Sequence, residues 1–149
     1  MSLPLIPASG GELPYLASGK AAQQLTATVP VDITFDVPGV VIGTDISYSA
    51  PASFILQPGR TYRLSAIIGY TGDTDEILVQ WVDSANSIVG APLTVLHTDF
   101  PDTLSFDHGH VIAYVTPVGV LTVKVRARSP NGESFDVVTT SIVEIQALN

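Results

Sequence analysis

The chain has 149 residues, which is enough for one domain with a hydrophobic core but hardly for two. It is 46% hydrophobic and only 13% charged, and no stretch approaches the roughly 20 consecutive apolar residues of a membrane helix. The lack of cysteine excludes disulfides, zinc–thiolate sites and thiol nucleophiles, and the formal charge of −8 argues against nucleic-acid binding. We expect a soluble chain with so few charges to bury part of its surface against other chains; the alternative is a closed monomer with a Ser/Thr-rich surface.

Residues 1–24 are predicted to form an extended N-terminal arm, because their prolines and glycines prevent a helix while their apolar residues are too numerous for a solvated tail. We expect the arm to lie on a neighbouring subunit or on another protein; a strand or strap folded over its own domain is the alternative. No basic region precedes the apolar residues, so a signal peptide is not expected and the chain is predicted to be made and used in a cytosol. The candidate contact residues of the arm are Leu3, Leu5, Ile6, Leu13, Tyr15 and Leu16.

Residues 25–149 are predicted to form a single β domain. Residues 31–37 alternate apolar and polar, and Pro38-Gly39 is expected to end this strand. In the strand at 60–70 one side is apolar throughout, whereas the other begins polar and ends apolar or bare. Turn residues recur about every eight to twelve residues and helix signals are almost absent, which favours an antiparallel sandwich or barrel. Further strands are expected at 40–43, 45–50, 53–56, 76–83, 87–96, 102–106, 110–116, 120–128, 133–138 and 140–148.

The segments SFILQPGRTYRLSAII, ILVQWVDSANSIVG and SIVEIQAL resemble the jelly roll of tumour-necrosis-factor-like and C1q-like trimers and of bacteriophage virion proteins. The hairpin HVIAYVTPVGVLTVKVRAR is similar to hairpins of such phage proteins. The likeness covers residues 31–148, and it implies an all-β, antiparallel jelly-roll sandwich or barrel with one sheet face packed against the next subunit of a homotrimer. The polar-to-apolar side of 60–70 would then be buried at a three-fold axis; the alternative is that the second sheet and the arm cover it. The candidate trimer-interface residues are Ile67, Trp81 and Tyr114.

Two polar clusters are weighed as metal sites and set aside. His108 and His110 have a spacing that places both rings on one face of a strand, but Gly109 between them indicates a polar turn. The acidic stretch at 72–76 is interpreted as a solvated hairpin tip, because alone it supplies too few carboxylates for calcium. We therefore expect no metal and no cofactor.

A basic stripe is predicted on one face of the strand at 120–128. Its cations are expected to pair with carboxylates across the sheet, and docking onto an acidic shell protein is the alternative. The cations are Lys124, Arg126 and Arg128, and the carboxylates weighed as partners are Asp32, Asp36 and Glu144.

The sequence shows no nucleophile elbow of the G-x-S-x-G type and no Gly-rich phosphate loop, so we do not expect an enzyme. The apolar arm resembles those that anchor small capsid decoration proteins and tail-fibre heads to a virion. The prediction is a structural virion protein: a capsid decoration (cement) protein, made in the host cytoplasm, that binds the major capsid shell as a homotrimer and stabilises it. The alternatives are the receptor-binding head of a phage head or tail fibre and, more distantly, a cytosolic β-sandwich enzyme or sugar-binding domain. The absence of heptads or repeats for a fibre shaft favours decoration.

Overall fold

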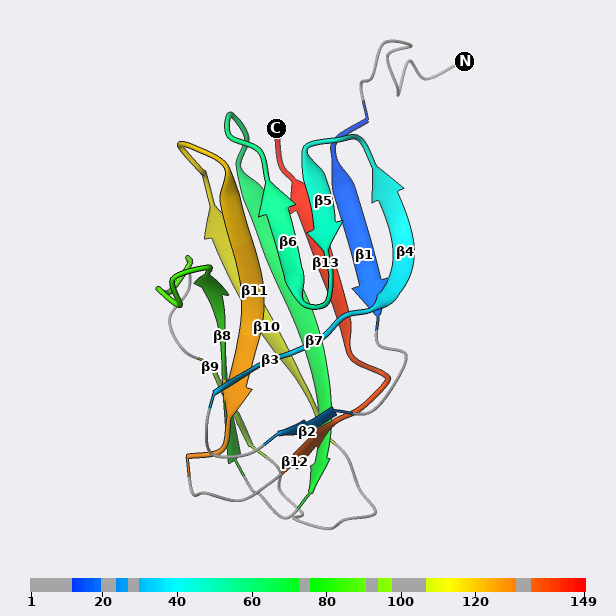
Figure 1. The fold of residues 1–149 in the computed structure, drawn as a ribbon, viewed down its shortest axis with the longest axis vertical. Helices are drawn as coiled ribbons and strands as arrows, with labels where there is room; N and C mark the ends of the chain where they lie inside the picture. The colour runs from blue at the N-terminus through cyan, green and yellow to red at the C-terminus, as the bar shows by residue number, and fades with distance from the viewer. Residues whose placement is uncertain are drawn as a thin grey trace, which may run out of the picture.

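The computed structural model describes residues 12–19, 24–26, 30–72, 76–90, 94–97, 107–130 and 135–149. All regular elements in these ranges are β-strands, and they form two antiparallel sheets packed face to face (Figure 1). This confirms the predicted all-β, antiparallel jelly-roll sandwich. In the described part of the chain no helix is long and apolar enough to cross a bilayer.

The first sheet, sheet A, has the order β2-β12-β7-β13-β1-β4, and β10 pairs with the other edge of β7. The strands of sheet A are β1 (Tyr15–Gly19), β2 (Gln24–Thr26), β4 (Val37–Ile42), β7 (Tyr62–Gly72), β10 (Asp107–Val115), β12 (Phe135–Val137) and β13 (Ile142–Ala147). The second sheet, sheet B, has the order β5-β6-β11-β8-β9, with β3 also paired to β11. The strands of sheet B are β3 (Val31–Asp32), β5 (Ile46–Ser49), β6 (Ser53–Leu56), β8 (Glu76–Asp83), β9 (Thr94–His97) and β11 (Leu121–Arg128).

The core lies between the sheets and follows from the two-residue period of the strands. On β7 the predicted apolar side faces inward, and every one of its five residues is buried. They are Tyr62, Leu64, Ala66, Ile68 and Tyr70. Alternate residues of β8 and β11 oppose them from sheet B, and each large apolar side chain buried in this way contributes roughly 1.5–3 kcal/mol.

Trp81 belongs to this core, so its prediction as a trimer-interface residue is wrong. Its side chain is 1% exposed, and its indole Nε1 donates a hydrogen bond of 3.1 Å to the carbonyl oxygen of Val111. The strand around it is apolar on both faces, and the sequence alone does not show which face is inside. The indole joins sheet B to β10 of sheet A and has no surface to offer another subunit.

The prediction that residues 1–24 form an arm separate from the domain is also wrong for the described part of that segment. β1 pairs with β13 along its whole length and with β4 on its other edge, and β2 pairs with β12. Leu16 is 1% exposed and lies in the core, while Tyr15 lies on the other face of the same strand. The alternative, a strand folded into its own domain, is therefore the correct one here. Leu3, Leu5 and Ile6 lie outside the described residues, and Leu13 is exposed.

The expectation that Pro38-Gly39 ends a strand is wrong as well, because both residues lie inside β4. Pro38 is tolerated because β4 is at the edge of sheet A, where one side of the strand needs no donor. Gly39 is required by its neighbour, since a Cβ there would lie 2.4 Å from the carbonyl oxygen of Ala17. The register shifts at this point, between Leu16 and Ser18 of β1, as at a bulge.

Candidate functional site

The outer face of sheet A is the side turned away from sheet B, and it is the candidate functional site. It consists of the side chains of β1, β13, β7 and β10 that alternate with the core residues. They are Tyr15, Ala17, Ile142, Glu144, Gln146, Arg63, Ser65, Ile67, His110, Ile112 and Tyr114. The face thus joins residues from both ends of the chain and from its middle.

The strand register arranges these side chains in rows across the sheet, and directly opposed residues bring their Cβ atoms to within about 5.5 Å. One row consists of Tyr15, Gln146, Arg63 and Tyr114. The next consists of Ala17, Glu144, Ser65 and Ile112. The third places Ile142 opposite Ile67, with His110 on the far side of Ile67. Polar and apolar side chains are therefore mixed, with the isoleucines gathered in the second and third rows.

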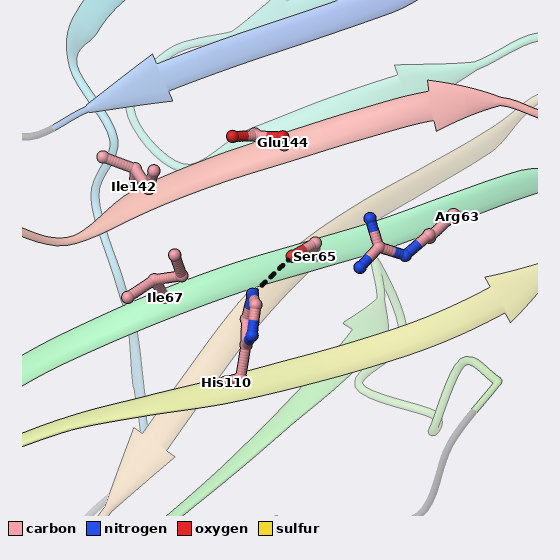
Figure 2. Close-up of a pocket in the computed structure, with 6 residues that line it drawn as sticks. All are labelled: Arg63, Ser65, Ile67, His110, Ile142 and Glu144. Atoms are coloured by element: carbon pink, nitrogen blue, oxygen red, sulfur yellow. Dashed lines mark hydrogen bonds between the residues drawn. The ribbon is translucent and has the colours of Figure 1, made fainter.

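A hollow of about 110 Å³ lies in the middle of this face (Figure 2). Its lining residues are Arg63, Ser65, Ile67, His110, Ile142 and Glu144. The hollow forms because Ser65 is much shorter than its neighbours, and the Ser65 hydroxyl is 3.0 Å from Nε2 of His110.

The contact between Ser65 and His110 brings a hydroxyl to a possible base, but Glu144 is not placed to complete a catalytic relay. His110 projects from β10 and Glu144 from β13, which lie on opposite sides of β7 (Figure 2). A relay needs the acid against the ring of the base, on the side away from the nucleophile. The ladders on both edges of β7 also engage its backbone N–H groups, which an oxyanion hole needs.

Apolar side chains remain partly uncovered on this face. Ile142 is 36% exposed and Tyr114 is 57% exposed, while Ile67 and Ile112 are half-buried. Ile67 and Tyr114, two of the three predicted interface residues, therefore lie on one face, and their contact with another subunit stays a prediction. An apolar cluster of this kind is typical of a surface that another protein covers.

The two charges at the hollow are in different environments. Glu144 accepts a hydrogen bond from the Tyr15 hydroxyl. Burial, then the negative charge of Glu144 and this hydrogen bond, raise the pKa of Tyr15 above its usual value. Among the described residues, no hydrogen bond or ion pair reaches the guanidinium of Arg63, which is half-buried.

A second apolar surface lies at the end of the sandwich where β1 begins and β13 ends (Figure 1). We call it the terminal end and define it by Leu13, Val118, Val120 and Leu148. Val118 is fully exposed at the tip of the β10–β11 turn. Hydrogen bonds join these segments: Ala147 donates to Pro14, Leu148 donates to Thr61, and the Thr61 hydroxyl is 2.9 Å from that of Thr116.

Arg60 holds the terminal end together. Its Nε lies 2.6 Å from Oδ2 of Asp45, in the β4–β5 turn, and Nη1 donates to the carbonyl oxygen of Asn149. Two turns and the C-terminal residue are thus connected by one side chain. The exposed apolar residues of this end therefore lie on segments that are fixed to one another.

Two of the three cations of the basic stripe pair across sheet B as predicted, and their shared partner is Asp32. Nζ of Lys124 lies 3.0 Å from Oδ2 of Asp32, and Nε of Arg126 lies 3.0 Å from Oδ1 of Asp32. The Arg126 contact is ionic, since its angles do not fit a hydrogen bond. Arg128 has no such partner among the described residues.

The two clusters weighed as metal sites fall partly outside the described residues, including Asp73, Asp75 and the side chain of His108. In the ranges that the structure describes, no group of His, Asp or Glu is arranged to hold a metal ion. The expectation of a turn at Gly109 is wrong, because Gly109 lies inside β10 opposite Ile68. His110 is consequently a residue of the outer face of sheet A.

Sequence reasoning singled out Ile67 and Tyr114 and placed the side of 60–70 that carries Arg63 and Ser65 at the expected interface. It missed the other members of the site: His110, Ile112, Ile142 and Glu144. The two-residue alternation places each of them on one side of its own strand. The missing information is that β13 and β10 flank β7, which is a long-range pairing.

No family model and no curated protein sequence match the chain. Solved structures do match its fold. Eiger TNF from S. frugiperda superposes with a TM-score of 0.64 at 13% identity, covering 91% of this chain and 94% of that one. The globular domain of zebrafish complement 1qA protein gives 0.62 at 11% identity, covering 91% and 98%. The vertex protein P5 of phage PRD1 gives 0.56 at 14% identity, covering 92% and 96%. The chain therefore has the jelly-roll fold that these proteins share.

Proposed function

We propose that the protein is a structural component of a phage virion that associates as a homotrimer through the outer face of sheet A. The observation that carries this proposal is the group of partly uncovered isoleucines around the hollow, with Tyr114 beside it. Covering about 800 Å² per neighbour would bury these side chains and make an ordinary stable interface. The resemblance to tumour-necrosis-factor-like and C1q-like trimers supports three subunits.

We further propose that the terminal end attaches the trimer to the capsid shell, in the manner of a decoration protein. Its apolar residues are exposed on segments that Arg60 links to one another, and Leu13 at the start of the domain lies there. The similarity to a phage vertex protein supports a virion location. Attachment adds buried area between shell subunits and requires no catalysis, which agrees with the separation of His110 and Glu144 on opposite sides of β7. Leu3, Leu5 and Ile6, which precede this end, are the proposed additional contacts.

Light scattering after size-exclusion chromatography tests the first part. A trimer of the 15.7 kDa chain has a mass of about 47 kDa, and a single mass of 15.7 kDa at high concentration would contradict the proposal. Co-sedimentation with empty expanded shells of the encoding phage tests the second part.

Two variants separate attachment from folding. V118D places a charge at the exposed tip, so we expect it to abolish co-sedimentation and to leave the trimer intact. Deletion of residues 1–11 spares β1 and is expected to weaken attachment without unfolding the domain. D136N, on β12, lies well away from the terminal end and serves as the control that should still bind shells.

A receptor-binding fibre head is the second candidate. It is favoured by the placement of the start of β1 and the end of β13 at one end of the sandwich, which leaves the opposite end for a ligand (Figure 1). Binding of the trimer to host cells but not to shells would select this candidate over decoration.

A further inference from the structure

Arg63 and Glu144 carry opposite charges and line the same hollow on the outer face of sheet A (Figure 2). They come from neighbouring strands: Glu144 lies opposite Ser65, and Arg63 is two residues before Ser65 on β7. Even so, among the described residues of one subunit, no ion pair joins Arg63 to Glu144. The lining of the hollow thus contains one cation and one carboxylate that do not neutralise each other.

Covering this face with another protein would remove water from both groups. A charge that loses water without gaining a partner strongly destabilises an interface. A guanidinium is best compensated by a carboxylate, which accepts two parallel hydrogen bonds from it. Any protein that covers the hollow therefore has to bring a carboxylate to Arg63 and a donor to Glu144.

A second copy of the same chain brings both. In a closed ring the contact is head-to-tail, so a residue of one subunit meets a different residue of the next. Because the cation and the carboxylate line one hollow, a three-fold axis near the hollow brings Arg63 of each subunit towards Glu144 of the next. An outside partner would have to match the same charge pattern independently.

Resting on the proposed homotrimer, we propose that Arg63 of each subunit forms an ion pair with Glu144 of the next subunit, giving a ring of three pairs. The ring sets the rotation and register of the subunits, which the isoleucines around it do not, because apolar contacts are not directional. Tyr15 positions the Glu144 carboxylate through its hydroxyl.

Reciprocal charge reversal in the full-length chain tests this pairing. R63E and E144R alone should each weaken association about 10-fold or more, because each places like charges at every interface. The double variant R63E/E144R should recover most of the wild-type association. Sedimentation velocity over a concentration series measures all four proteins.

Mixing the two single variants decides whether the pair lies between subunits. Most interfaces of a mixed trimer bring opposite charges together, so the mixture should associate more tightly than either variant alone. A pair within one subunit would not be restored by mixing, and that result would overturn the proposal. The neutral variants R63Q and E144Q give the same test with smaller perturbation if a reversal fails to fold.

R128E is the matched control, since it makes the same charge change on the outer face of sheet B and should leave association unchanged. If the wild type is a trimer and the reversals have no more effect than R128E, the ion-pair ring is wrong and the proposed homotrimer stands. If the wild type is a monomer at all concentrations, the proposed homotrimer and the ring both fail.

Discussion

The outer faces of the two sheets differ in how their charges and apolar residues are covered. On sheet B, Asp32 lies between Lys124 and Arg126, at 3.0 Å from each. Val82, an outward apolar residue of β8, is fully buried beside Ile88 from the following turn. On sheet A, Ile142 and Tyr114 are exposed, and Ile67 is half-buried.

The difference shows that alternation alone does not define a solvent face. β11 and β7 have the same two-residue period, but the outward residues of β11 are Thr122, Lys124, Arg126 and Arg128, whereas β7 presents a mixture that ends in Ile67. Long cationic side chains keep their charged tips in water, so one shared carboxylate is enough to pair with two of them on this face. Isoleucines at outward positions remain in contact with water unless another chain covers them.

The largest effect is expected inside the sandwich, where both sheets depend on Trp81. W81A should lower the free energy of unfolding by about 3–5 kcal/mol, because it leaves a cavity and removes the bond to Val111. W81F should be milder, at about 1–2 kcal/mol, since it keeps most of the buried volume. Denaturant unfolding measures both variants. Loss of the trimer with unchanged unfolding would instead return Trp81 to the interface.

The next effect distinguishes the two outer faces directly. I142D should weaken association by about 2 kcal/mol or more, roughly 30-fold, because it brings a carboxylate into the apolar part of the proposed interface. I55D is the control on sheet B, where Ile55 is half-buried and faces outward from β6. Light scattering at decreasing concentration compares the two, and equal loss of association would mean that the faces do not differ in function.

Much of the fold was predictable because its signals are local. The alternation along 60–70 grouped five residues on one apolar side, and that side is the buried one: Tyr62, Leu64, Ala66, Ile68 and Tyr70. Turn residues located most of the strands. The pairing of Lys124 and Arg126 with Asp32 was also predictable, since the alternation places both cations on one side of their strand.

The errors arose where the decisive contact is distant in the sequence. β1 is short and lies among prolines and glycines, and only its pairing with β13, near the other end of the chain, makes it a central strand. Gly39 lies inside a strand that passes so close to Ala17 that a Cβ would not fit, and the residues next to Gly39 in the sequence do not show this. The hollow was invisible for the same reason, since Ser65 and Glu144 meet only through the register of β7 and β13.

A smaller effect is expected from breaking the ion pairs of sheet B. D32N should lower the free energy of unfolding by roughly 1 kcal/mol, because Lys124 and Arg126 lose a shared, partly exposed carboxylate. Association should not change, in contrast to the reversals at Arg63 and Glu144. The unfolding midpoint in low and high salt measures the effect, which should shrink as salt screens the pairs. A D32N variant that lost the trimer would place sheet B in the interface.

The smallest effect concerns Tyr15, which reports on Glu144 from the same face. Its pKa is raised chiefly by burial and further by the charge and hydrogen bond of Glu144, so E144Q should lower that pKa part of the way toward the ordinary value of about 10. The pKa of Tyr15 is higher in the folded state than in the unfolded state. Its contribution to the free energy of unfolding is therefore complete below about pH 10 and is lost as the pH rises through the folded-state pKa. Tyr62 is the internal control: its pKa is raised by burial and by Asp45, so E144Q should leave it unchanged. The I142D variant is used because it is expected to dissociate the trimer. NMR titration of the Tyr15 and Tyr62 rings then measures both pKa values in a single subunit. A Tyr15 pKa that does not respond to E144Q would mean that Glu144 is oriented by another group, and Tyr15 would then have no part in placing the carboxylate for Arg63.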